Sequence, residues 1–456
     1  MNFIEKFDEW GIDLSQLTKK KQQTNKKIEY VRDYIIRWSA ISAVRADVNT
    51  ITFIDCMSNA GVYCDGDCCT AIEVLKVFTD FAETLVKQGH EVTVLTGKPN
   101  YGFKEILPEY KKVKYEEING VKVHRVKLAP RKDSKISIIR NYMSFHRNGK
   151  RFARHFKDHF DVVLATSLSP VISVSPALKY AKKHKVPCVL YCQDLWPEAP
   201  VVTGMIRKNS LAFKIIRKWS KSIYSRCDRI VISSPSFKDY FVKELHIEDK
   251  VFNVVNQPII KSNKQEEPIK YQNKHNLVYA GNIGSMQMID LLVKSLRYTK
   301  TPDIKLHLLG TGSLLKQVQK QIVDDGLKDK VEYHGNLPIE QAEAYFANAD
   351  ALVVSLKNNG YVGKTIPNKA IQYLKYGKPI LGVVSGDTKA LLENAKGAVF
   401  AGENAQNIAE NMDILLNMSD KEKDQLGLSN KKYFEENFSI EKLTQLLVAE
   451  LNEVKK

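Results

Sequence analysis

Short apolar runs alternate with amphipathic stretches along the chain from residue 51 onward. Ile51–Cys56, Glu91–Thr96, Asp161–Ala165 and Val186–Tyr191 are each long enough for one strand, and helical periodicity fills the intervals between several of them. Strands that are buried on both faces read as continuous apolar runs, and crossover helices connect them when they are parallel. The pattern therefore predicts an α/β protein with doubly wound parallel sheets.

Changes in polarity divide this pattern into segments. Residues 1–50 read as polar and mostly helical, and residues 257–275 are polar, contain two prolines and read as a linker. Strand–helix alternation occurs on both sides of that linker. We therefore predict a helical N-terminal extension (1–50), a first Rossmann-like domain (51–256), the linker (257–275), a second Rossmann-like domain (276–435) and a terminal helix (436–456).

Composition narrows the class of protein. The chain has 456 residues, 43% of them hydrophobic, and seven cysteines at irregular spacing, which suits a reducing compartment. Neither a membrane-spanning run nor a signal-peptide core is apparent, so we expect a cytoplasmic protein. The net charge of +17 suits an anionic partner such as nucleic acid, anionic lipid or a sugar nucleotide, and equally a lysine-rich solubilising surface.

The stretch YVGKTIPNKAIQYLKYGKPIL, Tyr361–Leu381, is a candidate phosphate site. A glycine-containing loop leads into a predicted helix, Asn368–Tyr376, which Gly377 ends and for which Asn368 is the expected N-cap. Lys364 and Lys369 flank its amino end, where free N–H groups and the helix dipole favour an anion. The alternative is an ordinary loop–helix–strand connection with two solvated lysines.

Other loops follow predicted strands at the edge where α/β proteins bind ligands. In the second half, Gly281–Ser285 has the form of a strand–loop–helix phosphate cradle, and the loops Gly310–Ser313 and His334–Leu337 follow two further strands. In the first half, CQDLWPE places Asp194 and Trp196 after the strand Val186–Tyr191. The alternative for that motif is a capped strand-to-helix turn with a core tryptophan.

The predicted helix Ser137–Phe160 is both basic and amphipathic. Such a helix can lie on an anionic membrane surface, or it can pack on the sheet with a solvated basic face.

The segments GKTIPNK, YGKPI and QDLWPE resemble the GT-B-fold family-4 glycosyltransferases that build bacterial capsule and O-antigen, and the resemblance covers about 78–452. It implies a first, acceptor domain and a second, donor domain that face a cleft. It further implies transfer with retention from a nucleotide-diphosphate sugar to a lipid-linked or oligosaccharide acceptor, without a metal or a cofactor. Nucleic acid is then not an expected partner, whereas peripheral contact with the inner face of the cell membrane stays open.

The resemblance also assigns roles to residues, with departures from the family pattern. Two family glutamates correspond to Lys364 and Gln372, and a family Arg and Lys correspond to Asn282 and Gln287. His334 is either a nucleotide contact or a plain strand-end residue. The expected donor-binding residues are Gly281, Asn282, Gly284, Gly312, His334, Lys364, Asn368, Lys369 and Gln372. The expected acceptor-side residues are Lys98, Asp194 and Trp196, and Lys369 and Asp194 are the catalytic candidates, with Lys369 and the helix ends at Gly284 and Asn368 stabilising the departing diphosphate.

Residues 1–78 resemble the amino end of the three-Cys-motif partner family through FIDCMSNAGVY and DGDCCTAIEVL. This suggests a fusion in which Ile51–Cys56 takes the first-strand position beside Glu91–Thr96, with Thr70–Gln88 as one crossover helix. Two alternatives stay open: a methyltransferase-like or partner-binding protein that binds S-adenosylmethionine at Ile54–Gly61, and a glycosyltransferase that is inactive or impaired toward its acceptor. We expect Cys64, Cys68 and Cys69 to be thiols, with a zinc site as the alternative.

Overall fold

The computed structural model describes residues 50–54, 70–99, 105–132, 134–167, 170–202, 205–256, 259, 267 and 269–454, with the backbone alone at 50–54 and 70–78. The predictions for the extension before residue 50 and for the cysteine-containing loop 55–69, including the zinc and S-adenosylmethionine alternatives, lie outside these residues.

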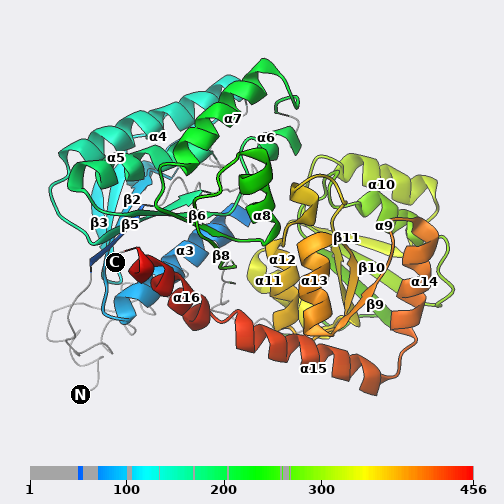
Figure 1. Cartoon of the computed structure of the whole chain (residues 1–456). Coiled ribbons are helices and arrows are strands. Elements are labelled where there is room, and N and C mark those ends of the chain that lie inside the picture. The colour runs from blue at the N-terminus through cyan, green and yellow to red at the C-terminus, as the bar shows by residue number, and fades with distance from the viewer. Residues whose placement is uncertain are drawn as a thin grey trace, which may run out of the picture. The chain divides into compact units, whose positions relative to one another are not determined.

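The first half of the described chain forms an eight-stranded sheet with the order β3-β4-β2-β1-β5-β6-β7-β8 (Figure 1). All neighbours pair in parallel except β3 and β4, which form the hairpin at Asn119-Gly120. The strands are β1 (Thr50–Ile54), β2 (Glu91–Gly97), β3 (Tyr115–Ile118), β4 (Val121–Val126), β5 (Val162–Ser167), β6 (Cys188–Cys192), β7 (Arg229–Ile232) and β8 (Phe252–Val254).

Strand β1 confirms the predicted position of the apolar run that begins at Ile51. It pairs in parallel with β2 through Phe53 and Val94, and with β5 on its other side. The described part of the connection from β1 to β2 contains the predicted helix, α3 (Thr70–Lys87). With β1 in place, the strands β4-β2-β1-β5-β6 correspond to the 3-2-1-4-5 order of a doubly wound domain. Ligands of such domains bind near the strands in positions 1 and 4, which are β1 and β5 here.

Helices cover both faces of this sheet. One face carries α4 (Lys135–His155), α5 (Ser175–His184), α7 (Leu211–Tyr224) and α8 (Ser236–Asp239), whose apolar residues join Val163 and Leu190 in one core. The other face is covered by α3 and the terminal helix α16 (Ile440–Glu453). Short pieces complete this half: α6 (Glu198–Val202), the 3-10 turns η2 (Pro108–Tyr110) and η3 (Val171–Val174), and the π-helical turn η4 (Tyr240–Glu244).

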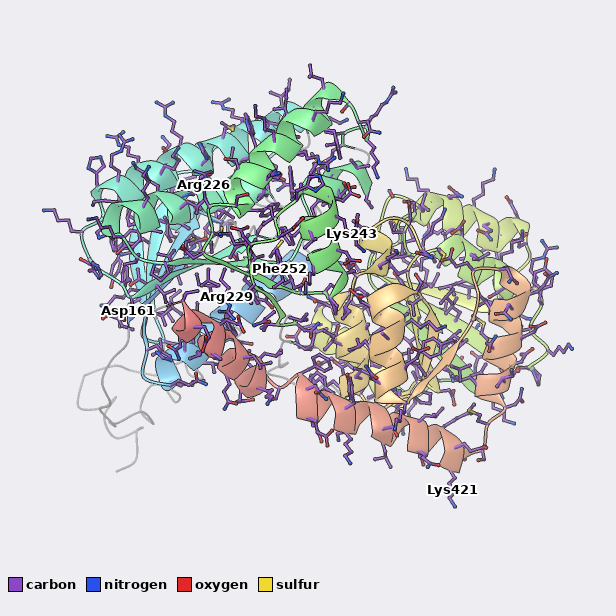
Figure 2. The ribbon with its side chains drawn as sticks, in the orientation of Figure 1. Asp161, Arg226, Arg229, Lys243, Phe252 and Lys421 are labelled. Carbon is purple, nitrogen blue, oxygen red and sulfur yellow. The ribbon has the colours of Figure 1, made fainter. Side chains whose placement is uncertain are left out.

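The terminal helix α16 packs against the first domain. Leu443 and Leu447 of α16 pack in the core beneath β5 and β6. Glu450 forms an ion pair with Arg229 on β7, which Figure 2 shows beside this helix. It also accepts a hydrogen bond of 2.7 Å from Asn253 Nδ2 on β8.

The second half forms a six-stranded parallel sheet with the order β11-β10-β9-β12-β13-β14, which is the same doubly wound pattern. Its core has α9, α10 and α14 on one face and α11, α12 and α13 on the other, while α15 packs on α12 and α13. The strands are β9 (His275–Ala280), β10 (Ile304–Leu309), β11 (Val331–Gly335), β12 (Ala351–Ser355), β13 (Ile380–Val383) and β14 (Ala398–Phe400). The helices are α9 (Ile289–Ser295), α10 (Leu315–Asp324), α11 (Ile339–Asn348), α12 (Asn368–Lys375), α13 (Gly386–Ala395), α14 (Ala405–Leu416) and α15 (Asp420–Asn437), with the 3-10 turn η5 (Val362–Lys364).

Some predicted helix limits are wrong for local reasons. The basic helix α4 begins earlier, because Ser134 Oγ caps it by accepting from Ser137 N–H, and it ends at His155 rather than Phe160. Asn368 is the first residue of α12 and not its N-cap, a position that Pro367 occupies in extended conformation. The cradle at Gly284 does not open a helix, because Met288 has φ 50° and α9 begins only at Ile289.

Candidate functional site

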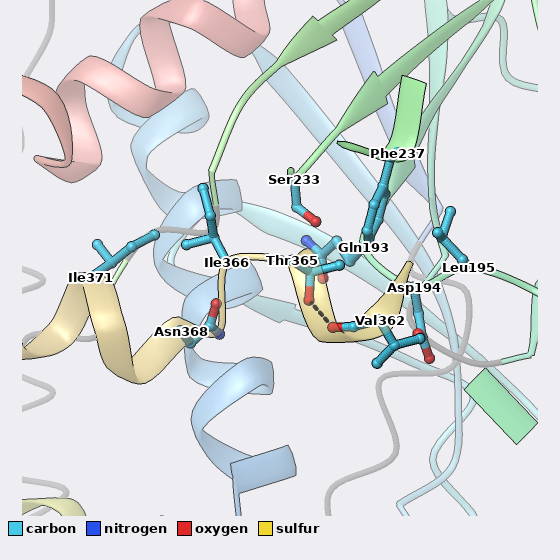
Figure 3. A pocket seen from close by; sticks show the side chains of 10 residues that line it. All are labelled: Gln193, Asp194, Leu195, Ser233, Phe237, Val362, Thr365, Ile366, Asn368 and Ile371. Carbon is cyan, nitrogen blue, oxygen red and sulfur yellow. Dashed lines mark hydrogen bonds between the residues drawn. The ribbon is translucent and has the colours of Figure 1, made fainter. Parts of the chain in front are cut away.

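A pocket between the two halves brings the QDLWPE segment against the start of α12. Its cavity volume is about 70 Å³, which is smaller than the roughly 300–1,000 Å³ common for sites that hold a whole small-molecule ligand. Figure 3 shows the side chains that line it: Gln193, Asp194, Leu195, Ser233, Phe237, Val362, Thr365, Ile366, Asn368 and Ile371. Asp194 and Asn368 were both predicted as site residues from opposite halves, and here they line one pocket.

Polar contacts across the halves fix the walls of this pocket. Ile366 N–H donates to Ser234 Oγ at 2.7 Å, directly after the lining residue Ser233. Ser236 N–H donates to the Asp387 carboxylate at 2.7 Å. Because the backbone of each half is held by a side chain of the other, the loop before α12 is positioned against the β7–α8 turn.

Asp194 is the carboxylate of the pocket. It lies just beyond the carboxyl end of β6, the edge at which parallel sheets present ligand-binding side chains. Burial raises the pKa of Asp194 to about 8. At neutral pH the side chain therefore carries a proton and can donate a hydrogen bond to a hydroxyl or a phosphate oxygen, in addition to accepting one.

Lys369, the second residue of α12, lies in a different environment from that of a solvated lysine. Its Nζ donates to the Tyr279 hydroxyl at 2.6 Å and lies 3.9 Å from the centre of that ring. Tyr279 OH in turn donates to the carbonyl of Asn282 at 2.7 Å. Burial lowers the pKa of Lys369 to about 7, so its amine can gain a proton when an anion binds beside it.

The glycine loops of the second sheet pack closely around this amine. A Cβ on Gly281 would lie 3.3 Å from Lys369 Nζ. A Cβ on Gly310 would lie 2.0 Å from the Gly281 carbonyl oxygen, and one on Gly312 would lie 2.3 Å from that of Ile283. Only glycine permits this approach, and the loops Gly281–Ser285 and Gly310–Ser313 are therefore in mutual backbone contact, with Ile283 N–H donating to Thr311 O at 2.8 Å.

The uncharged residues at the family's Arg and Lys positions bond to each other. Asn282 Nδ2 donates to Gln287 Oε1 at 3.1 Å, and Gly284 lies beneath that pair. The loop therefore offers backbone N–H groups and amides rather than cations, which leaves Lys369 as the cation next to Gly281.

Lys364 and Gln372, at the positions of the family's glutamates, lie on either side of the start of α12. Lys364 is exposed on η5, and Gln372 is half-buried one helical turn after Asn368. Neither lines the pocket with Asp194.

Three predicted site residues lie elsewhere. Trp196 is buried in the core of the first half, where its carbonyl accepts from Tyr240 OH at 3.0 Å, so the core-tryptophan alternative is correct. Lys98 is buried at the end of β2 and donates to the Lys111 carbonyl. His334 bonds to His307 and Tyr345 instead of lining the pocket.

The sequence did not reveal Tyr279 and Ser234 as part of this site. Both contacts join positions far apart in the chain, 90 residues for Lys369 and Tyr279 and 132 for Ile366 and Ser234. Only the assembled sheets bring them together.

Comparison with known families matches both halves of the chain. Residues 74–259 match the family described as Glycosyltransferase Family 4, and residues 260–432 match the family Glycosyl transferases group 1. The two matches lie end to end and together cover residues 74–432. The resemblance of residues 1–78 to a partner family is not among these matches.

A curated glycosyltransferase is similar to part of the chain. A probable glycosyltransferase, WbjE of Pseudomonas aeruginosa, is 26% identical over 233 residues, which are 49% of this chain and 57% of the relative. The chain spans about half the length of the curated relatives it matches.

Two solved structures show the same fold. Sucrose-phosphate synthase from Thermosynechococcus elongatus aligns with a TM-score of 0.68 at 14% identity, over 89% of this chain and 99% of that one. HepE from Anabaena in complex with UDP aligns with a TM-score of 0.62 at 11% identity, over 89% and 100%. The predicted fold class, two Rossmann-like domains of the GT-B kind, is therefore confirmed.

Proposed function

We propose that this chain transfers a sugar from a nucleotide-diphosphate sugar to a polysaccharide precursor, with retention of the anomeric configuration. The observation that carries the proposal is the pocket that Asp194 and the start of α12 share. The matches to two glycosyltransferase families and the UDP bound to HepE support the choice of co-substrate.

In this proposal the second half holds the diphosphate. The N–H groups of Gly281 and Ile283 donate to the carbonyls of Leu309 and Thr311. The remaining N–H groups of the Gly281–Ser285 loop and the amino end of α12 face the diphosphate, and the Lys369 ammonium neutralises the charge that develops as the sugar–phosphate bond breaks. The electron pair of that bond goes to the diphosphate oxygen. A buried amine is suited to this task, because its charge interacts more strongly with a phosphate in a low-dielectric site than in water.

The acceptor enters from the side of Asp194. Since Asp194 is protonated at neutral pH, it orients a hydroxyl of the sugar or the acceptor by hydrogen bonding, and it does not serve as a strong base there. In a retaining transfer the acceptor hydroxyl bonds to the anomeric carbon on the face that the diphosphate leaves, and the departing phosphate oxygen takes the proton.

A thermal-shift screen of UDP-, GDP- and dTDP-sugars on the untagged chain tests the proposal. We expect one nucleotide class to raise the melting temperature, with an increase that grows with ligand concentration over Kd. Absence of any shift, at concentrations that stabilise a known nucleotide-sugar enzyme run in parallel, would contradict the proposal.

A separate observation favours a lipid-linked acceptor at a membrane. Helices α4 and α7 contain no acidic residue, and both pack on the η3 turn. Ile136, Ile139 and Met143 are exposed on α4, and Leu211, Ile215 and Trp219 are exposed at i, i+4 and i+8 on α7. Apolar side chains between lysines and arginines match an anionic lipid surface. Among the described residues, no helix is long and apolar enough to cross a bilayer.

We expect the chain to float with vesicles that contain phosphatidylglycerol and not with pure phosphatidylcholine, and the bound fraction to fall with salt. The double variant Ile215→Ser and Trp219→Ser should lose most of the bound fraction. Ile414→Ser, which changes an exposed isoleucine on α14, is the matched control. Equal flotation on both kinds of vesicle would contradict an electrostatic attachment.

A further inference from the structure

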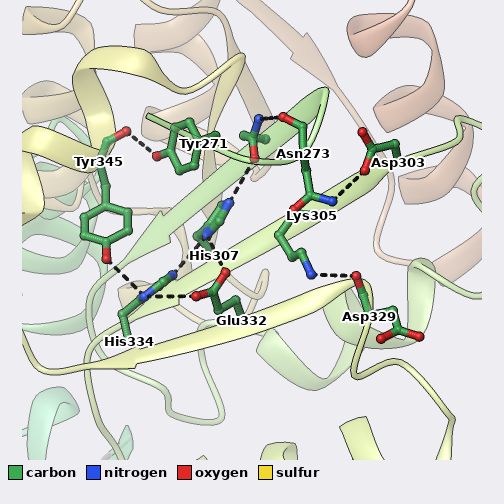
Figure 4. A network of polar contacts seen from close by, with 10 residues as sticks. Tyr271, Asn273, Asp303, Lys305, His307, Asp329, Glu332, His334 and Tyr345 are labelled. Atoms are coloured by element: carbon green, nitrogen blue, oxygen red, sulfur yellow. Dashed lines mark hydrogen bonds and ion pairs between the residues drawn. The ribbon is translucent and has the colours of Figure 1, made fainter. Parts of the chain in front are cut away.

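A cluster of two histidines and a glutamate lies at the edge of the second sheet. His307 is on β10, and Glu332 and His334 are on the edge strand β11. One ligand atom from each of the three lies within 4.8 Å of the others. Figure 4 shows the three side chains converging, with Tyr345 and Tyr271 packed around them.

The register of the two strands produces this convergence. His307 pairs with Glu332, but a bulge then shifts the register so that Leu309 pairs with Gly335. Glu332 and His334, two residues apart on one strand, share a face of the sheet with His307. The bulge leaves His334 as the extra residue of β11, a position at which such irregularities re-aim side chains.

Hydrogen bonds determine which ring nitrogen of His307 carries the proton. Asn276 Nδ2 donates to the Asn273 carbonyl at 2.7 Å, which turns Asn276 Oδ1 toward the histidine. The contact of 3.1 Å between Asn276 Oδ1 and His307 Nε2 therefore requires a proton on Nε2. His307 Nδ1 is left with a lone pair, and it lies 3.0 Å from His334 Nε2 and 3.7 Å from Glu332 Oε2.

The second histidine has a partner that accepts either tautomer. His334 Nδ1 lies 3.1 Å from the Tyr345 hydroxyl, which can donate to this nitrogen or accept from it. When His334 Nε2 carries the proton, it donates to His307 Nδ1. When Nδ1 carries it instead, the two facing nitrogens both present lone pairs, and the Glu332 carboxylate lies beside them, with Oε1 3.9 Å from His334 Nδ1.

We propose that His307 Nδ1, His334 Nε2 and the Glu332 carboxylate bind a Zn²⁺ ion, with water in the fourth position. Two nitrogens bound to zinc at the tetrahedral angle lie roughly 3.3 Å apart, given bonds of about 2.0–2.1 Å. The two histidine nitrogens are 3.0 Å apart, so they need to separate only slightly to bind zinc. Imidazole and carboxylate ligands are a set that zinc prefers over magnesium.

The surroundings have the features of a supported metal site. Each ligating histidine has its other nitrogen held by a neutral polar group, Asn276 for His307 and Tyr345 for His334, as outer-shell partners usually do. The Glu332 side chain is 54% exposed and provides the route of entry, while that of His307 is only 5% exposed.

The ion would link β10 to β11 immediately before Gly335, whose carbonyl accepts from Gly310 N–H at 2.6 Å. It would therefore brace the carboxyl ends of two strands beside the glycine loops. This role is structural and separate from glycosyl transfer, so the proposal stands or falls independently of the function proposed above.

Zinc binding is measured on the untagged full chain after chelator treatment, with its cysteines alkylated by N-ethylmaleimide so that thiols cannot contribute. Titration calorimetry should show one equivalent of Zn²⁺ bound and no binding of Mg²⁺. Co²⁺ in place of zinc should give the visible absorption of a four-coordinate site.

Single-residue variants test whether the bound zinc occupies the proposed site. Glu332→Gln and His334→Gln should weaken zinc binding at least about tenfold, and Tyr345→Phe should weaken it by about 10- to 100-fold through the orientation of His334. His155→Ala, an exposed histidine on α4, is the matched control and should bind as the parent does. Zinc binding that disappears on alkylation, or that is equal in Glu332→Gln, His334→Gln and the control, would overturn the proposal.

Discussion

The buried amine of Lys369 makes nucleotide binding depend on pH near neutrality. Its pKa is about 7 without ligand because burial disfavours the charged form, and a bound diphosphate favours that form. Affinity for a nucleoside diphosphate should therefore fall as the pH rises from about 7 toward 9, and binding in that range should take up a proton. Calorimetry in buffers of different ionisation enthalpy measures this uptake, which a Lys369→Met variant should lack.

Asp194 makes the stability of the fold, rather than ligand binding, depend on pH. Burial raises its folded pKa to about 8 from an ordinary value of 3.8, so between these limits the folded state holds a proton that the unfolded state has released. The contribution of Asp194 to the free energy of unfolding is therefore full below about pH 4 and is lost as the pH rises through 8. Relative to the parent, Asp194→Asn should be more stable at pH 9 than at pH 5. Urea midpoints that differ by the same amount at both pH values would show that Asp194 is not protonated in the fold.

At the scale of elements, the contact between the two glycine loops determines the shape of the donor side. Gly310 has φ 125°, and a Cβ there would lie 2.0 Å from the backbone oxygen of Gly281. Gly310→Ala should therefore cost about 2 kcal/mol or more in the free energy of unfolding and should weaken nucleotide binding.

Gly326→Ala is the matched control for this change, because Gly326 also has a positive φ, of 66°, but has no atom within 4 Å of an added Cβ. Its cost should stay near about 1 kcal/mol, with nucleotide affinity unchanged. Equal losses in the two variants would mean that backbone strain, and not the contact between loops, accounts for the effect.

Helices α7 and α9 and strand β1 show which structural features could be predicted from the sequence. Leu211, Ile215 and Trp219 recur every fourth residue among lysines, a pattern that could have been recognised alongside the basic helix α4. In contrast, the late start of α9 follows from Met288 adopting a positive φ, which no local sequence signal specifies. Strand β1 was predictable because an apolar run and the crossover helix after it fit one place in a parallel sheet.

At the scale of the whole molecule, Glu450 links the end of the chain to the first sheet. Its side chain and that of Arg229 are only 11% and 13% exposed, and removing one partner leaves the other buried and uncompensated. Glu450→Ala should lower the free energy of unfolding by roughly 3 kcal/mol, measured by urea denaturation. Glu436→Ala, which removes an exposed ion pair on α15, should change it little. Similar midpoints for the two variants would show that the Arg229–Glu450 pair does not hold α16.

The candidate site could be predicted only in part, because its residues come from separate elements. Asp194 and Asn368 follow from motifs at strand and helix ends, which is local information. The burial of Trp196 depends on Tyr240 and Tyr224, and the environment of Lys369 depends on Tyr279, so both required the assembled core. The residues at the family's charged positions gave no hint that Asn282 and Gln287 would bond to each other.

The proposed function requires Lys369 and the glycine loops to bind the diphosphate of a sugar nucleotide. Calorimetric titration of the parent, Lys369→Met and Lys375→Met with the nucleoside diphosphate selected by the thermal-shift screen tests it most directly, at pH 6.5, where the Lys369 amine is mostly protonated. Lys375 lies on the same helix but pairs with Glu343 at 2.9 Å, so it is the matched control. Lys369→Met should lose about 1.5–3 kcal/mol of binding free energy, while Lys375→Met should bind as the parent does. Equal affinity in the parent and Lys369→Met would contradict it.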